Sequence, residues 1–311
     1  MKVSIIMCSY NGEEFIERAI ESVLAQTYTN WELIICDDQS KDRSMALIEQ
    51  YTSDPRIKLI QQPQNLGYVR NKNFGFSQAT GELLTQLDSD DTSPPERIAK
   101  QVQVFLDHPE INICGTNYQQ VDTEDAPLNP VQYPSDFIIE KPGKPYPFWY
   151  PGLMFRASII QEFGLFSEYF DKLYGDDKYW TLKVNSRYPI YFIKDILYNY
   201  RINPNSITNV LDNPRKLIVV EILEELLHQI QSTGTTCLEQ GNPEQLRMFE
   251  QSIMTNKTIM AEKYRIWAAK AIDKRDMARA KKLLLKSLSL SAINKATYKT
   301  AFYYLRKNLV A

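Results

Sequence analysis

Leu83-Leu84-Thr85-Gln86-Leu87-Asp88-Ser89-Asp90-Asp91 is an apolar run that ends in three carboxylates within four residues. The run from 83 to 87 predicts a buried strand. Like charges crowded at a strand end repel one another, and this costs free energy unless a cation joins them. Oxygen ligands without neighbouring His or Cys suit Mg²⁺ or Mn²⁺ rather than zinc, and such an ion keeps positions open for phosphate groups. The stretch therefore predicts a metal site that can hold a diphosphate.

Segments typical of strands alternate with segments typical of helices through residues 1–115. The predicted strands are Val3–Cys8, Trp31–Cys36, Ile57–Ile60, Glu82–Leu87 and Ile111–Cys114. The predicted helices, chosen by apolar spacing and capping residues, are Glu13–Gln26, Asp42–Tyr51, Arg70–Ala79 and Pro95–Leu106. This alternation with short loops predicts an α/β fold, with a mostly parallel sheet covered by helices on both faces.

Polar side chains directly follow three of the predicted strands. Ser9-Tyr10-Asn11 follows the first strand, Asp37-Asp38 the second and Asp88 to Asp91 the fourth. The carboxyl ends of parallel strands form one edge of a sheet, where ligands bind, so we expect these segments to converge on one crevice. The sequence has neither a GxG pattern nor GxxxxGK[ST]. A nucleotide bound there is therefore held by side chains and a cation rather than by a glycine-rich loop.

Composition restricts the class of protein. The chain has 311 residues, 43% of them hydrophobic and 24% charged, as in an ordinary globular protein, and its net charge of −2 gives no nucleic-acid signature. Two His in the whole chain supply little for a His-based zinc site or a Ser-His-Asp triad. No apolar run is long enough to span a bilayer. Four cysteines without a CxxC pair are typical of reduced core thiols in a cytoplasmic protein.

The later part of the chain changes character. Residues 116–210 are less regular, and 141–152 (KPGKPYPFWYPG) can be neither a helix nor a central strand. The aromatic side chains of that loop either stack on a sugar ring or pack on the sheet. The predicted helices after Pro214 are Leu217–Gln229, Glu244–Ile272, Asp276–Ser289 and Thr297–Leu309. We therefore expect one domain over residues 1–212 and a C-terminal helical region over 213–311.

The C-terminal region is strongly basic. Residues 261–311 hold thirteen Lys and Arg against three acids, a balance of +10, so the remaining 260 residues carry −12. A basic amphipathic helix can lie on an anionic membrane, and it can equally dock a protein partner. The third possibility is a solvated helical face that closes the domain.

Two blocks of sequence now point to a family. Residues 3–42, VSIIMCSYNGEEFIERAIESVLAQTYTNWELIICDDQSKD, and residues 64–91, QNLGYVRNKNFGFSQATGELLTQLDSDD, resemble the opening of the family 2 glycosyltransferases of GT-A fold. The resemblance is dense over about the first hundred residues and thinner to about residue 208. It implies a nucleotide-binding half (1–115) and an acceptor-binding half (116–212). It also implies a nucleotide-sugar donor, taken here as a UDP-sugar, with Mn²⁺ or Mg²⁺ and inversion at the anomeric carbon.

Carried over residue by residue, the resemblance implies a donor site and a metal site. Asp38 would accept the imide N–H of the base, Asp90 would bond the ribose, and Asp91 would ligate the metal. The implied donor-binding residues are Ser9, Tyr10, Asn11, Asp38, Arg70, Lys72, Asp88 and Asp90, and the implied metal ligands are Asp91, Asp90 and Asn203. The family often has His where Asn203 stands, and a neutral amide oxygen binds a metal more weakly. Each carboxylate could also be a solvated turn or a helix cap, and Arg70 and Lys72 could be solvated charges.

The catalytic base is expected in the later motif YGDDKYW, residues 174–180, where the family usually has Glu-Asp. Asp176 keeps the four-residue spacing to Trp180 and is the preferred base, with Asp177 as the alternative. A carboxylate there takes the proton of the acceptor hydroxyl as its oxygen attacks the anomeric carbon. The expected acceptor contacts are Trp149, Tyr150 and Trp180. The same acids could instead cap a helix.

Three functions are compatible with these motifs. The leading one is a metal-dependent hexosyltransferase of polysaccharide biosynthesis that acts on a glycan, lipid-linked or glycoprotein hydroxyl. Such an enzyme would be cytoplasmic or peripheral at the inner face of the membrane. A glycoside hydrolase would explain a pair of acids but not Asp38 or the clustering at strand ends. A catalytically degenerate sugar-nucleotide-binding protein in a glycan-assembly complex is favoured by the missing His and disfavoured by the intact acidic motifs.

Overall fold

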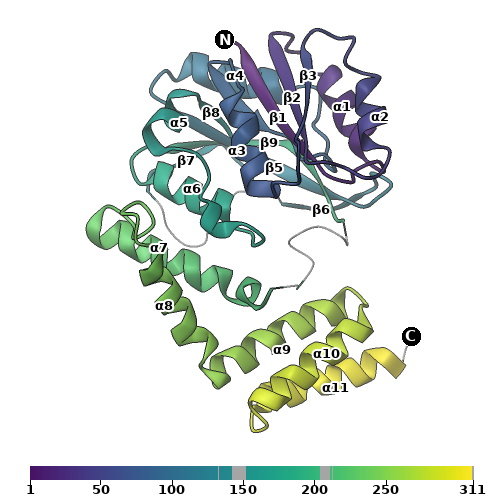
Figure 1. Ribbon diagram of the computed structural model, residues 1–311, viewed down its shortest axis with the longest axis vertical. Helices are drawn as coiled ribbons and strands as arrows, with labels where there is room; N and C mark the ends of the chain where they lie inside the picture. The colour runs from purple at the N-terminus through teal and green to yellow at the C-terminus, as the bar shows by residue number, and fades with distance from the viewer. Residues whose placement is uncertain (132, 142–151, 204–210, 212, 310–311) are drawn as a thin grey trace. The chain divides into compact units, whose positions relative to one another are not determined.

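The computed structural model describes residues 1–131, 133–141, 152–203, 211 and 213–309 (Figure 1). The chain divides into two units, residues 1–210 and residues 211–311. We call them the N-terminal unit and the C-terminal unit. The N-terminal unit contains the sheet, and the described part of the C-terminal unit is entirely helical.

The first four strands of the N-terminal unit are parallel neighbours. They are β1 (Val3–Ser9), β2 (Trp31–Asp37), β3 (Ile57–Gln61) and β4 (Leu83–Gln86), in the order β3-β2-β1-β4. Each lies within one residue of its predicted bounds at either end. In this register Ser9 pairs with Asp37, so the polar residues at the carboxyl ends of β1 and β2 meet at one edge of the sheet.

Helices cover both faces of the sheet, as predicted (Figure 1). One face packs against α1 (Ile16–Leu24), α2 (Ser44–Glu49) and α4 (Arg97–Asp107), and the other against α3 (Tyr68–Ser77), α5 (Ser158–Phe163) and α6 (Asp176–Asn185). Successive strand residues supply the two cores, because Ile5 packs with the first group and Ile6 with the second. Gly75 lets α3 approach the sheet closely, since a Cβ there would lie 2.6 Å from Ile6 Cγ2.

The second half of the sheet is mixed. β8 (Met154–Arg156) is inserted antiparallel between β4 and β5 (Ile113–Val121), and β9 (Ile190–Arg201) pairs parallel with β5. The antiparallel strands β6 (Pro127–Val131) and β7 (Phe137–Ile139) pair with β5 and β9 respectively. The twelve-residue β9 is long enough to return beside the acidic stretch, where Asn199 bridges Thr92.

The four cysteines are buried and free, as expected for core thiols. Burial raises the pKa of the Cys36 and Cys114 thiols to about 12, so both stay protonated and inert at neutral pH. These thiols therefore belong to the packing of the core rather than to its chemistry.

The C-terminal unit consists of a short 3₁₀ segment, η3 (Pro214–Ile218), and the helices α7 (Val219–Thr233), α8 (Pro243–Met254), α9 (Lys257–Asp273), α10 (Met277–Leu290) and α11 (Lys295–Leu309). The prediction of one helix over 244–272 is wrong. That helix is broken at Thr255-Asn256, because the Asn256 side chain accepts hydrogen bonds from the Thr258 and Ile259 N–H groups, both at 3.1 Å, and so starts α9. Among the described helices, none is long and apolar enough to cross a membrane.

Candidate active site

Hydrogen bonds from β9 fix the acidic loop, residues 88–91. Asp91 is 1% exposed; its Oδ2 accepts from the Tyr198 hydroxyl and its Oδ1 from the Arg201 N–H, both at 2.7 Å. Asn203 Nδ2 donates to Asp90 Oδ2 at 3.1 Å. The structure therefore brings together the three residues that the resemblance implies as metal ligands.

Burial raises the pKa of all three carboxyls of the loop, and repulsion adds to the rise at Asp88 and Asp91. Burial, and then the charge of Asp90, raises the pKa of Asp88 to about 6. Burial raises the pKa of Asp90, and burial followed by the charges of Asp90 and Asp88 raises the pKa of Asp91 well above its usual range. A cation beside these oxygens would relieve the cost of ionising them. Within the described residues, however, no group of three or more His, Cys, Asp or Glu side chains is arranged so that it could hold a metal ion.

Arg201 is a residue that the sequence analysis missed. Its buried guanidinium donates from Nε to the Asp90 carbonyl at 2.7 Å and from Nη1 to the Asp122 carbonyl at 2.8 Å, and Nη2 pairs with Asp125 at 2.5 Å. The same group lies 4.6 Å from the centre of the Phe15 ring. Arg201 therefore fixes the backbone of the acidic loop. No sequence pattern announces it, because its partners lie on three separate segments.

The residues after β1 line the same edge. Ser9 is buried, and its Oγ has no hydrogen-bond partner within the described part of the chain, so a ligand could bond it there. Tyr10 is 52% exposed. Asn11 has a left-handed backbone (φ 51°); its Oδ1 accepts from the Lys41 N–H at 2.8 Å and its N–H donates to Ser40 Oγ at 2.9 Å. Asn11 thus ties the loop after β1 to the loop after β2.

Asp37 and Asp38 organise the loops after β2. Asp37 accepts hydrogen bonds from the N–H and the hydroxyl of Ser40 and so shapes that turn. The Asp38 carboxylate accepts from the Leu66 N–H at 2.7 Å and the Gly67 N–H at 2.9 Å, just before α3. A base contact by Asp38 would therefore use lone pairs left over from these bonds, and it stays a prediction.

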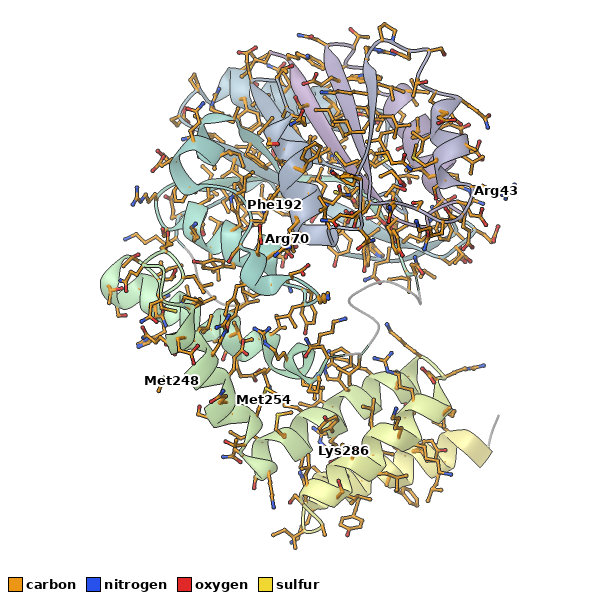
Figure 2. All side chains as sticks on the ribbon, viewed as in Figure 1. Arg43, Arg70, Phe192, Met248, Met254 and Lys286 are labelled. Carbon is orange, nitrogen blue, oxygen red and sulfur yellow. The ribbon has the colours of Figure 1, made fainter. Side chains whose placement is uncertain are left out.

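Arg70 and Lys72 point in different directions, because residues two apart do not share a helix face. Arg70, labelled in Figure 2, is exposed and pairs with Glu168 of the 3₁₀ turn η2 (Glu168–Phe170) at 2.8 Å. Lys72 is fully buried and forms an ion pair with Asp176. Its ammonium lies 3.9 Å from the centre of the Phe166 ring. A diphosphate contact by Lys72 would have to share the cation with Asp176.

Asp176 is the first residue of α6 and follows Gly175, whose φ is 102°. Its carboxylate is almost completely buried, whereas Asp177 is partly exposed. Burial, and then repulsion from Asp176, raises the pKa of Asp177. Both carboxylates lie in the first turn of α6, at the positive end of the helix dipole.

Helix α3 links the Asp176 carboxylate to the acidic loop. The Tyr68 hydroxyl donates to Asp88 Oδ1 at 3.2 Å, and the Lys72 ammonium lies 4.9 Å from the centre of the Tyr68 ring. Tyr68 and Lys72 are one helical turn apart, so they share a face. The two acidic motifs, separated by more than eighty residues of sequence, therefore meet across one face of α3.

Trp180 is not an accessible acceptor contact, contrary to the prediction. It is 1% exposed, its ring packs 4.7 Å from that of Phe155 and 5.3 Å from that of Phe166, and its Nε1 donates to the Gly164 carbonyl at 3.0 Å. Its spacing of four from Val184, another core residue, was the signal for burial. The other predicted acceptor contacts, Trp149 and Tyr150, lie outside the described residues.

Comparison with known proteins gives the class. A family model described as Glycosyl transferase family 2 matches residues 4–164, about half of the chain. The chain belongs to the family 2 glycosyltransferases, and the resemblance noted in its sequence is confirmed.

Several curated relatives carry similar stretches. One, the UDP-Glc:alpha-D-GlcNAc-diphosphoundecaprenol beta-1,3-glucosyltransferase WfgD of Escherichia coli, is 38% identical over 120 residues, which is 39% of this chain and 47% of WfgD. An uncharacterized glycosyltransferase of Haemophilus influenzae (strain ATCC 51907 / DSM 11121 / KW20 / Rd) is 27% identical over 239 residues, 72% of each chain. A third relative, the glycosyltransferase EpsE of Bacillus subtilis (strain 168), is 36% identical over 168 residues, which is 51% of this chain. The matches span about half the length of WfgD and 58% of the length of EpsE.

A solved structure shares the fold. Residues 1–349 of S. aureus TarS, in complex with UDP-GlcNAc, match with a TM-score of 0.63 at 19% identity, over 97% of this chain and 92% of that one. At this identity the match shows the fold alone. It confirms the GT-A class of α/β sheet that the sequence predicted.

Proposed function

We propose that this chain transfers a hexose from a nucleotide-sugar, with UDP as the nucleotide, to a hydroxyl of a glycan, a lipid-linked glycan or a glycoprotein. The reaction inverts the anomeric carbon and depends on Mn²⁺ or Mg²⁺. Family membership supports the reaction class. WfgD, named for a UDP-Glc donor, and TarS, solved with UDP-GlcNAc, support the choice of UDP.

The observation that carries the proposal is the meeting of the two acidic motifs across α3. Tyr68 bonds Asp88 of the acidic loop, and Lys72 pairs with Asp176. A transferase needs a donor diphosphate site and a carboxylate base close together, because the acceptor oxygen attacks the carbon that the diphosphate leaves. The hypothesis of a glycoside hydrolase explains neither the buried Lys72 nor the clustering of Asp38 with Ser9 at the edge of parallel strands.

In the proposed mechanism Asp176 accepts the proton of the acceptor hydroxyl while that oxygen forms the new bond to the anomeric carbon. Inversion requires the attack to come from the face opposite the leaving diphosphate. Lys72 holds the Asp176 carboxylate in the buried site and keeps its charge balanced until the acceptor arrives. Ser9 Oγ, which lacks a hydrogen-bond partner within the described residues, forms a hydrogen bond with the nucleotide of the sugar donor.

The acidic loop supplies the chemistry expected of a site for a hard divalent cation. Asp90 and Asp91 would hold the ion, with Asn203 as a neutral neighbour. Burial raises the pKa of both carboxyls, and repulsion from Asp90 and Asp88 adds to the rise at Asp91, so a cation would relieve both effects. When bound, Mn²⁺ or Mg²⁺ would neutralise the charge that develops on the departing diphosphate. A degenerate binder stays the second candidate, because the Asn203 amide presents its nitrogen rather than its oxygen to Asp90.

The test is nucleotide release from UDP-, GDP- and dTDP-sugars in the presence of Mn²⁺, with binding of each nucleotide measured by calorimetry. We expect release from a UDP-sugar that stops on chelation. The Asp90→Asn variant should lose at least about tenfold in metal-dependent release. Asp107→Asn, an exposed site at the end of α4, is the matched control and should behave as wild type.

Asp176→Asn separates the two candidates. In a transferase it should lower turnover by about 10²- to 10⁴-fold and leave the dissociation constant of UDP nearly unchanged. Binding of UDP without release from any sugar donor, in wild type and variant alike, would support the degenerate binder. Absence of both release and binding would overturn the proposed function altogether.

A further inference from the structure

The last two helices, α10 and α11, carry side-chain charge of only one sign. From Met277 to Ala311 the sequence has no Asp or Glu. The basic residues of this stretch are Arg279, Lys281, Lys282, Lys286, Lys295, Lys299, Arg306 and Lys307. Lys286, labelled in Figure 2, lies on α10, and it is exposed together with Lys281 and Lys282. Nothing proposed for the transfer reaction uses this charge.

An exposed apolar stripe accompanies the charge on α11. Tyr298, Phe302 and Leu305 are spaced by four and three residues, so they share one helical face, and they are 54%, 71% and 55% exposed. At 100° per residue, Lys295, Lys299 and Arg306 fall immediately beside this stripe. Ile293, in the connection between α10 and α11, is 89% exposed.

We propose that the surface formed by α10, α11 and their connection binds an anionic lipid membrane. The exposed rings and Leu305 would enter the boundary between headgroups and acyl chains, and the neighbouring cations would contact lipid phosphates. Lipid fits better than a protein partner, because six of the eight cations are Lys. Protein interfaces are enriched in Arg and depleted of Lys, whereas a fluid anionic surface needs point charges and no fixed geometry.

The test is co-sedimentation of the full chain with vesicles of phosphatidylcholine, with and without about one third phosphatidylglycerol. We expect binding only to the anionic vesicles. Raising the salt from about 0.05 M to about 0.5 M should lower that binding by more than about tenfold, because it shortens the screening length. Phe302→Ser, which leaves the charge unchanged, should lower it by about threefold or more.

Charge reversal gives the sharpest comparison. Lys295→Glu/Lys299→Glu/Arg306→Glu should lower vesicle binding by at least about tenfold. The control Lys58→Glu/Lys194→Glu/Lys257→Glu makes the same change in net charge at exposed positions outside α10 and α11 and should bind as wild type. Circular dichroism establishes that each variant is folded. The proposal would be overturned by an equal loss of binding in both triple variants or by binding that does not depend on salt. It would also be overturned if the chain did not bind anionic vesicles at low salt, and that result would favour an acidic protein as the occupant.

Discussion

At the scale of single residues, the ion pair between Lys72 and Asp176 joins helix α3 to the start of helix α6. Both side chains are buried. Removing one member of a buried ion pair leaves an uncompensated charge, whereas removing both does not. The pair therefore couples the position of the proposed base to the fold of α3.

This coupling is measurable by a double-mutant cycle. Lys72→Met alone should lower the free energy of unfolding by about 3–5 kcal/mol, and Asp176→Asn alone should also be destabilising. The double variant should be more stable than the sum of the two losses predicts, by at least about 1 kcal/mol. Urea unfolding of the four proteins gives the coupling energy. Additive losses would mean that the two charges do not depend on one another.

At the scale of elements, Glu32 fastens three segments of the sheet together. Its carboxylate on β2 accepts from Ser4 of β1 at 2.5 Å, from the N–H and hydroxyl of Thr80 before β4 at 2.8 Å, and from Lys2 at 2.9 Å. Burial alone would raise its pKa, but these hydrogen bonds outweigh burial and lower the pKa of Glu32 to about 2.

The sign of the resulting pH effect follows from linkage. Because the folded pKa lies below the unfolded one, this carboxylate contributes stability above about pH 4.5, and the contribution is lost as the pH falls towards about 2. Glu32→Gln should therefore cost about 1–3 kcal/mol at pH 7, with the difference from wild type shrinking in acid. Urea unfolding at several pH values measures this. Glu49→Gln, an exposed site on α2, should change stability by less than about 0.5 kcal/mol, and a pH-independent loss in Glu32→Gln would contradict the assignment.

Much of the first half of the fold follows from sequence, because each element there carries its own local signal. The β-branched runs give β1 and β2, and their carboxyl ends place Ser9 beside Asp37. The insertion of β8 between β4 and β5 has no such signal, since a three-residue strand takes its place from its neighbours. The break at Asn256 was missed because the flanking apolar spacing continues on both sides of it.

The candidate site was predictable in its residue types but not in its connections. Like-charge crowding in the acidic loop is visible in the sequence, and so is the motif that contains Asp176. The pairing of Lys72 with Asp176 joins positions 104 apart, and the bond from Arg201 to the Asp90 carbonyl joins positions 111 apart. Such contacts depend on how the sheet is threaded. The role of Trp180 was predicted wrongly, because an aromatic side chain can pack in a core as well as it can stack on a sugar ring, and its residue type does not distinguish the two.

At the scale of the whole molecule, a bound cation should stabilise the folded chain. A ligand present at about a hundred times its dissociation constant adds about 2.7 kcal/mol. Saturating Mn²⁺ should thus raise the midpoint of thermal unfolding by about 5 °C or more, and chelation should reverse the shift. Calorimetry measures both. Asp90→Asn should lose most of the shift and Asp107→Asn should keep it; an equal shift in both would place the ion elsewhere.

The bonds behind Asp91 also set an order of events during synthesis. Tyr198 and Arg201 leave the ribosome 107 and 110 residues after the carboxylate that they bind. Until then the Asp91 carboxylate would lack its two β9 partners, although β1 to β4 could already pair. The nascent chain therefore cannot complete the proposed donor site early. Ribosome-bound fragments that end before β9 should neither retain UDP nor resist proteolysis at residues 88–91. The proposed competence for sugar transfer would therefore arise late, when β9 pairs with β5.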